Sequence, residues 1–257
     1  MSTIDSAEPG SEEAERRSDK ANWATSGRLR LNAAPPQGAI NLNVDGRVVT
    51  SPIQGFGKMW QKTYRVRLSS LAASPEEVIR EWKAHFPTFW PPGNRFYGPL
   101  TGLVPGDVAL LNLMMPGRQK LSTGVLVLYA DEESFTLMTP QGHVFAGWIT
   151  FSAFAESDET VVQAQVLMRA SDPAYELGLT LGGHAQENRF WEHTLTRVAA
   201  HFQQQGPVET STLCIDPRRQ WRRAGNIWHN AGIRTGLYVA TTPARWVGTG
   251  MRRIVRK

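Results

Sequence analysis

The sequence has only one cysteine, Cys214, among its 257 residues. A single cysteine cannot form a disulfide within the chain, so we expect a protein of the reducing cytoplasm. No apolar run approaches the roughly 18 residues that a membrane-spanning helix needs, and residues 1–10 lack the apolar stretch of a secretory signal. The hydrolase motif G-x-S-x-G and the zinc-protease motif H-E-x-x-H are also absent. With no catalytic motif, binding is favoured over catalysis, and no cofactor is expected.

The six histidines do not show the spacing of a metal site. A zinc site needs three or four ligands that can converge on one point. His184, Glu187 and His193 come nearest, but His184 and His193 are about two and a half helical turns apart. They would lie on different faces of a straight helix. We therefore predict no bound metal.

Positive charge is concentrated at the C-terminus. The whole chain has 28 Lys and Arg against 23 Asp and Glu. Residues 206–257 contain ten of the basic residues but only two acidic ones, so the rest of the chain is slightly acidic. This asymmetry predicts a basic C-terminal extension over residues 205–257.

Two segments precede the predicted folded domain. Residues 1–36 are rich in Ser, Ala and Glu, and they have few large apolar side chains to offset the entropy lost on folding. We interpret them as a disordered tail. Residues 37–56 alternate apolar and polar side chains up to Asp45-Gly46, a pair typical of a type I′ turn. They are predicted as a hairpin followed by a loop.

The pattern over residues 57–204 predicts one antiparallel sheet. Alternation with a period of two marks a first strand at residues 64–68. Short polar turns separate five further apolar segments, which predicts an antiparallel meander. These segments are residues 108–113, 123–129, 134–139, 143–154 and 160–170.

Two helices are predicted around this sheet. Ser74-Pro75 is typical of a helix start, with Ser74 as the N-cap, and the helix should end before Pro87. Asp172 and the proline that follows it begin a second, longer helix that ends near residue 203. A break in this helix is expected at Gly182 and the glycine after it.

This order of elements resembles the helix-grip fold of the START and birch-pollen-allergen-like superfamily (SRPBCC). The features that carry the resemblance are the strand at 64–68, the helix start at Ser74-Pro75-Glu76-Glu77, the meander and the terminal helix. The segments at 106–108, 129–133 and 172–178 are similar to bacterial members of the superfamily. The resemblance covers residues 60–204.

The resemblance implies an α+β fold in which a curved antiparallel sheet wraps around a long C-terminal helix, with a cavity between them. Members of the superfamily bind lipids, sterols, polyketides or plant hormones, and some catalyse cyclisation or dehydration. It therefore implies binding of a small, largely apolar molecule, with a cyclase or dehydratase reaction in the same cavity as the alternative.

Polar and aromatic side chains within the apolar elements are candidates for this pocket, because a few polar groups orient a ligand in an apolar cavity. Alternation does not show which face of a sheet is inward, so the polar strand residues can equally lie on the solvent face. His143 and Arg169 are the candidates for acid–base work. The pocket candidates are Trp82, Asn112, Tyr129, His143, Trp148, Gln165 and Arg169.

In the C-terminal extension, basic residues alternate with aromatic ones. Such a mixture binds an anionic membrane surface or, as the least favoured option, nucleic acid. Alternatively, the apolar residues pack back onto the domain while the arginines remain in solvent. Peripheral membrane association is thus the alternative to a purely cytoplasmic protein, and the oligomeric state stays open. The candidates for an anionic surface are Arg218, Arg219, Arg222, Arg223, Arg252 and Arg253.

Overall fold

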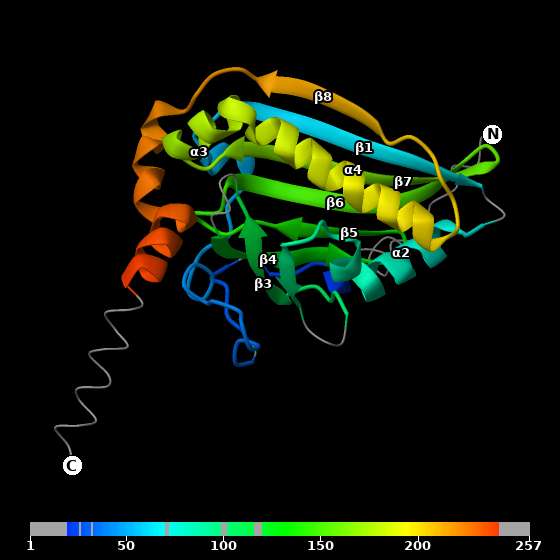
Figure 1. Cartoon of the computed structure of the whole chain (residues 1–257), viewed down its shortest axis with the longest axis horizontal. Coiled ribbons are helices and arrows are strands. Elements are labelled where there is room, and N and C mark those ends of the chain that lie inside the picture. Colours follow the sequence, from blue (N-terminus) through cyan, green and yellow to red (C-terminus); the bar gives the residue numbers. More distant parts are fainter. Residues whose placement is uncertain are drawn as a thin grey trace, which may run out of the picture.

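The computed structural model describes residues 20–241, apart from residues 26, 32, 70–71, 99–101 and 116–119. Within these residues the chain forms an eight-stranded antiparallel sheet with the order β2-β3-β4-β5-β6-β7-β1-β8 (Figure 1). The strands are β1 (Met59–Ser69), β2 (Arg95–Tyr97), β3 (Val108–Met114), β4 (Lys120–Ala130), β5 (Ser134–Met138), β6 (Phe145–Glu156), β7 (Glu159–Ala170) and β8 (Glu209–Asp216). The predicted first strand is confirmed as β1, and the predicted meander is confirmed as β3 to β7.

Helices α2 (Pro75–His85) and α4 (His184–His201) cover one face of this sheet. The Ser74 hydroxyl accepts a hydrogen bond from the Glu77 N–H at 3.2 Å, so the predicted N-cap of α2 is confirmed. Trp82 of α2 and Leu195 of α4 belong to the same buried apolar cluster as Phe151 and Val166 of the sheet. This cluster is the main core of the protein.

The long C-terminal helix is broken where the two glycines predict a break. Asp172 caps α3 (Pro173–Gly178), because its Oδ1 accepts hydrogen bonds from the backbone N–H groups of Ala174 and Tyr175. A π-helical turn, η4 (Leu179–Gly183), then connects α3 to α4. Gly182 adopts φ 120° there, a left-handed value that favours glycine. The predicted fold class, α+β with an antiparallel sheet around a long C-terminal helix, is confirmed.

The opposite face of the sheet is covered by the N-terminal segment. Leu29 and Val44 form a second buried cluster with Leu110, Leu126 and Met138 of β3, β4 and β5. Residues 1–19 of the predicted tail lie outside the described residues, but Leu29 is packed, so the tail prediction extends too far. The sequence around Leu29 is poor in apolar residues, and the sheet face that buries Leu29 comes from distant residues.

The predicted hairpin at Asp45-Gly46 is wrong, although its turn forms. The Arg47 N–H donates to the Val44 carbonyl at 3.0 Å, and Gly46 has φ 76°. However, the chain after the turn pairs with Leu29 and not with the residues before the turn. The Leu29 N–H donates to the Arg47 carbonyl at 2.7 Å, and the Leu29 carbonyl accepts from the Gly46 N–H at 2.9 Å.

Much of the predicted C-terminal extension is part of the fold. β8 pairs with β1 and adds a strand that the sequence pattern did not predict. The 3-10 helix η5 (Trp221–His229) then lies beside α3 (Figure 1). A helix over residues 231–241 follows, and its Thr235 hydroxyl accepts a hydrogen bond from the Ser122 N–H of β4 at 3.3 Å. Asn230, Ala231 and Thr235 are buried. The alternative in which the segment packs back onto the domain therefore holds for the described part of the extension.

Candidate functional site

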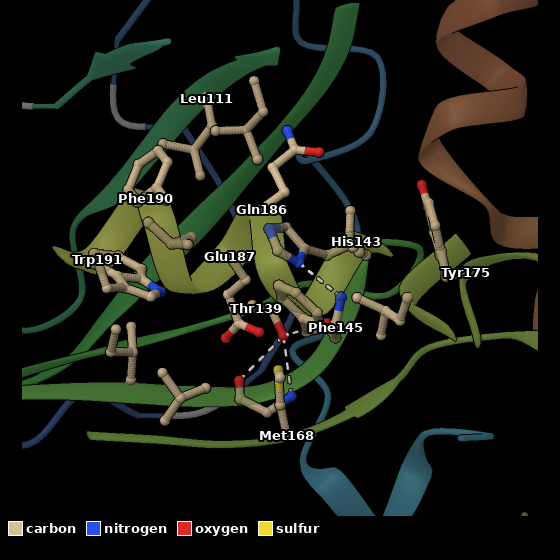
Figure 2. Close-up of a pocket in the computed structure, with 18 of the residues that line it drawn as sticks. Leu111, Thr139, His143, Phe145, Met168, Tyr175, Gln186, Glu187, Phe190 and Trp191 are labelled. Carbon is tan, nitrogen blue, oxygen red and sulfur yellow. Dashed lines mark hydrogen bonds between the residues drawn. The ribbon is translucent and has the colours of Figure 1, made fainter. Parts of the chain in front are cut away.

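A cavity of about 230 Å³ lies between the sheet and α4. Strands β3 to β7 form its floor, and α3, η4 and the first half of α4 form its cover. Its lining is mostly apolar, and Figure 2 shows apolar side chains from the sheet and from α4 surrounding a few polar ones. Apolar members of the lining include Leu111, Val125, Leu137, Val166, Met168 and Phe190.

The strands present apolar side chains to the cavity because their alternation has a period of two. Val166 and Met168 of β7 line the cavity, whereas Gln165 between them points to the other face of the sheet. On β3 and β4, Leu111 and Val125 face the cavity, while their neighbours Leu110 and Leu126 belong to the second core. The sheet thus separates the cavity from the N-terminal segment.

Glu187 of α4 brings a carboxylate to this apolar lining. Its side chain is only 6% exposed, and its Oε2 lies 2.8 Å from Nζ of Lys62 on β1. The Lys62 ammonium also donates to Oδ1 of Asn188 at 2.9 Å and to the His184 carbonyl at 3.4 Å. All three of its N–H donors therefore have acceptors. The Tyr64 hydroxyl donates to the same Asn188 oxygen at 2.9 Å, which helps to fix this buried cluster.

His143 is the second ionisable group in the lining. The Phe145 N–H donates to Nδ1 of His143 at 3.1 Å (Figure 2). Burial lowers the pKa of His143 to about 4, so the imidazole is neutral near pH 7. Because Nδ1 accepts a hydrogen bond, the proton is on Nε2. His143 can therefore donate a hydrogen bond from Nε2 but carries no charge.

Several other polar groups of the lining form hydrogen bonds within the fold. The Thr139 hydroxyl donates to the Phe145 carbonyl at 2.8 Å, and Gln186 donates to the Met114 carbonyl at 3.0 Å. The Tyr175 hydroxyl accepts from the Gly232 N–H at 2.8 Å, which attaches the C-terminal segment to the edge of the cavity. Open hydrogen-bonding capacity remains at Glu187 and His143, and the Trp90 indole N–H, also in the lining, is buried with no hydrogen-bond partner among the described residues.

Among the pocket candidates from the sequence, the structure places His143 and Trp148 in the lining. Trp82 lies in the main core, where its indole contacts Phe135 and Phe151. The remaining four candidates lie outside the cavity lining. These are Asn112, Tyr129, Gln165 and Arg169.

These four were misplaced because their strand faces point away from α4. Asn112 donates to the Gly38 carbonyl at 2.9 Å, and Tyr129 packs against Trp23, so both contact the N-terminal segment. Gln165 donates to the Thr63 hydroxyl at 3.2 Å. Gln165 and Arg169 lie on one face of β7, because strand side chains alternate with a period of two, and that face is not the one that lines the cavity.

Arg169 is a structural residue that joins β7 to the end of β8 and to the chain before β1. Its guanidinium donates to Asp216 Oδ2 and to the Gly57 carbonyl, both at 2.5 Å. Hydrogen bonds from the Arg218 N–H and from Arg169 lower the pKa of Asp216 to about 2. Arg169 is therefore not available for acid–base work in the cavity.

The arginine candidates for an anionic surface differ in their surroundings. Arg218 and Arg222 are exposed, and Arg218 is paired with Asp216 at 3.2 Å. Arg219 is paired with Glu176 of α3 at 2.9 Å, and Arg223 is partly buried. Arg252 and Arg253 lie outside the described residues.

The sequence pattern did not reveal Lys62 or place Glu187 in the pocket, although both residues interrupt apolar patterns. Lys62 shares a strand face with Tyr64 and Val66, which are buried. Glu187 precedes Phe190 and Trp191 by three and four residues, so it lies on the apolar side of α4. A basic and an acidic residue, each at an inward position of its element, were the signal for a buried ion pair.

No family model matches the chain, and no curated protein matches it. Solved structures that are similar to it include the di-domain ARO/CYC StfQ from the steffimycin biosynthetic pathway, at 9% identity and a TM-score of 0.42. That similarity covers 56% of this chain and 51% of StfQ, so the chain spans about half the length of StfQ.

Two further solved structures are similar to this chain over almost their whole length. Ara h 8.0201 has 11% identity and a TM-score of 0.40, with 56% of this chain and 98% of that chain covered. A START superfamily protein from Mycobacterium smegmatis has 20% identity and a TM-score of 0.39, with 57% and 98% covered. Each similarity concerns the arrangement of sheet and helices only.

In the part of the chain that the structure describes, no group of three or more His, Cys, Asp or Glu side chains is placed to hold a metal ion. No helix among the same residues is both long and apolar enough to cross a membrane.

Proposed function

We propose that this protein binds a small, largely apolar molecule in the cavity between the sheet and α4. The observation that supports this most directly is the lining itself, in which apolar side chains surround a few polar groups, among them Glu187 and His143. Ligand sites in proteins share this composition, because apolar contact supplies affinity and a few polar groups supply orientation. Each CH₂ group that a ligand buries there contributes about 0.8 kcal/mol.

Native mass spectrometry of the protein purified from its own host tests this proposal. We expect a bound species of a few hundred daltons that is lost on denaturation. The variant Val166→Phe places a larger side chain in the cavity and should lose that species. Leu167→Phe, on the opposite face of the same strand, is the matched control and should keep it. A wild-type protein that carries no such species and binds no added 2-methylnaphthalene would contradict the proposal.

A cyclase or dehydratase reaction in the same cavity is the second candidate. Glu187 can accept a proton, and neutral His143 can donate a hydrogen bond from Nε2 to a developing negative charge, so the cavity contains a base and a hydrogen-bond donor. If wild-type protein converts the co-purified molecule into a product lighter by one water and His143→Gln does not, catalysis replaces simple binding. If the molecule is unchanged after incubation with wild-type protein, the result supports binding without catalysis.

Membrane association through the C-terminal segment is a separate candidate. Trp221 and Trp228 are 72% and 83% exposed, and the exposed Arg218 and Arg222 lie in the same segment. Aromatic and basic side chains together favour an anionic lipid surface. Flotation with vesicles that contain phosphatidylserine should decrease with salt and in the variant Trp221→Ala/Trp228→Ala. Equal flotation of the variant and the wild type would contradict this role.

A further inference from the structure

The ion pair between Lys62 and Glu187 uses only one oxygen of the carboxylate. Oε2 of Glu187 lies 2.8 Å from the Lys62 ammonium. Oε1 is buried and has no hydrogen-bond partner among the described residues. Buried polar atoms in proteins nearly always have a hydrogen-bond partner. We therefore expect Oε1 to accept a hydrogen bond from a donor that is not one of the described residues.

The position of Glu187 indicates where this donor comes from. Glu187 belongs to the lining of the cavity together with Phe190 and Trp191, its neighbours on the same side of α4. Figure 2 shows its side chain extending from α4 toward the sheet, among the apolar side chains of the lining. Because Lys62 uses all three of its N–H donors, it cannot satisfy the second oxygen as well.

The charge of the pair restricts the kind of donor. Lys62 already compensates the negative charge of Glu187, so a cationic ligand group would bring an additional, uncompensated charge into an apolar cavity. An anionic group would be repelled by the carboxylate and would pay the same desolvation cost. A neutral O–H donor pairs with Oε1 and adds no charge.

We infer that Glu187, held in place by Lys62, is the polar anchor for a ligand that carries a neutral hydroxyl group, an alcohol or a phenol, on an apolar skeleton. This inference rests on the proposed function, since it concerns the ligand of the same cavity. The hydroxyl donates to Oε1 of Glu187, and the apolar skeleton lies against residues such as Val166 and Phe190. Glu187 is thus a specificity-determining residue, and Lys62 positions it.

Two probes of nearly equal shape test the anchor in the wild-type protein. 2-Naphthol carries a hydroxyl where 2-methylnaphthalene carries a methyl group. Apolar burial alone favours 2-methylnaphthalene, whereas a hydrogen bond to a charged acceptor favours 2-naphthol by about tenfold or more in dissociation constant. We expect 2-naphthol to bind at least about tenfold more tightly, and to bind more tightly than 2-naphthoate and 2-naphthylmethylammonium.

A double variant tests the anchor without leaving a charge unpaired. Glu187→Gln alone removes the partner of Lys62 and can unfold the protein, but Lys62→Met/Glu187→Met replaces both charges by apolar groups of similar length. In this variant 2-methylnaphthalene should still bind and the preference for 2-naphthol should disappear. The control Arg65→Met/Gln163→Met removes a polar pair, joined at 2.7 Å between Nε and Oε1, and should keep the preference.

The possible failures are distinguishable. If neither naphthalene derivative binds the wild-type protein, the proposed function fails and the anchor fails with it. If both bind with equal affinity, or if the double variant keeps the preference for 2-naphthol, the cavity binds apolar molecules but Glu187 is not the anchor.

Discussion

The side-chain amide of Asn230 donates a hydrogen bond to Oδ2 of Asp172 at 2.8 Å, and both residues are buried. Asp172 caps α3, which forms part of the cavity cover, so this bond joins the C-terminal segment to the candidate site. The contact beside it, from the Gly232 N–H to the Tyr175 hydroxyl, has the same effect. The C-terminal segment therefore supports the site structurally.

Asn230→Ala should weaken this support. The substitution removes the hydrogen bond and leaves Oδ2 of Asp172 buried without that donor, which costs roughly 1–3 kcal/mol of unfolding free energy. Urea denaturation of the variant and the wild type measures the difference. Gln205→Ala changes an exposed amide and is the control. A variant as stable as the control would show that the buried bond contributes nothing.

Truncation after Gly206 should destabilise the protein severely. It removes β8, leaves β1 as an unpaired edge strand, and deprives the buried Arg169 of its partner Asp216. We expect aggregation or a strongly lowered melting temperature. A chain that ends at residue 241 keeps these contacts and is the control. A soluble chain ending at Gly206 with the melting temperature of the control would refute the structural role of the segment.

Gly142→Ala should disturb the packing between the turn before β6 and the end of η5. Gly142 has φ 89°, and an added Cβ would lie 2.0 Å from the His229 carbonyl oxygen. Since this neighbour is backbone, we expect a loss of roughly 2 kcal/mol or more in unfolding free energy. The control is Gly225→Ala, where nothing lies within 4 Å of the added Cβ. Equal stability of the two variants in a thermal melt would contradict the close packing.

The buried imidazole of His143 predicts a pH dependence of stability. Its pKa is about 4 in the folded protein, against 6.5 for an unperturbed histidine. Between these pH values the unfolded chain binds a proton that the folded protein does not, so stability rises with pH. The contribution is fully present above pH 6.5, and on the order of 3 kcal/mol is lost as the pH falls to 4.

Urea denaturation at pH 4.5, 5.5 and 7 measures this dependence. His143→Gln should make the rise in stability with pH less steep over this window. His193→Gln controls for the loss of an imidazole as such. The burial of a neutral His143 would be disproved by a variant with the same pH dependence as the wild type.

Local signals predicted most of the fold correctly. Ser74 and Asp172 are N-caps because their side chains hydrogen-bond to backbone within three residues, so a short stretch of sequence contains the whole interaction. Gly182 breaks the helix for an equally local reason. The Asp45-Gly46 turn also forms, but the strand partner of the following chain, Leu29, is determined by distant packing.

The candidate site was harder to predict, because a residue lines the cavity only if its side chain lies on the inward face of its strand or helix. No sequence motif with a fixed spacing marks that face. Period-two alternation places Gln165 and Arg169 on one face of β7, but it does not show on which side α4 packs. β8 was missed because its side chains are mostly exposed and show no apolar alternation. Lys62 and Glu187 are far apart in the sequence, and their pairing becomes visible only when β1 and α4 are placed together.

The proposed ligand site lies between the sheet and α4. Nuclear Overhauser effects between bound 2-naphthol and the methyl groups of the protein show whether a ligand binds there. We predict contacts with Val166, Met168 and Leu111, which line the cavity. Contacts confined to Ile233 and Leu237, exposed apolar residues of the C-terminal segment, would place the ligand outside the cavity and contradict the account.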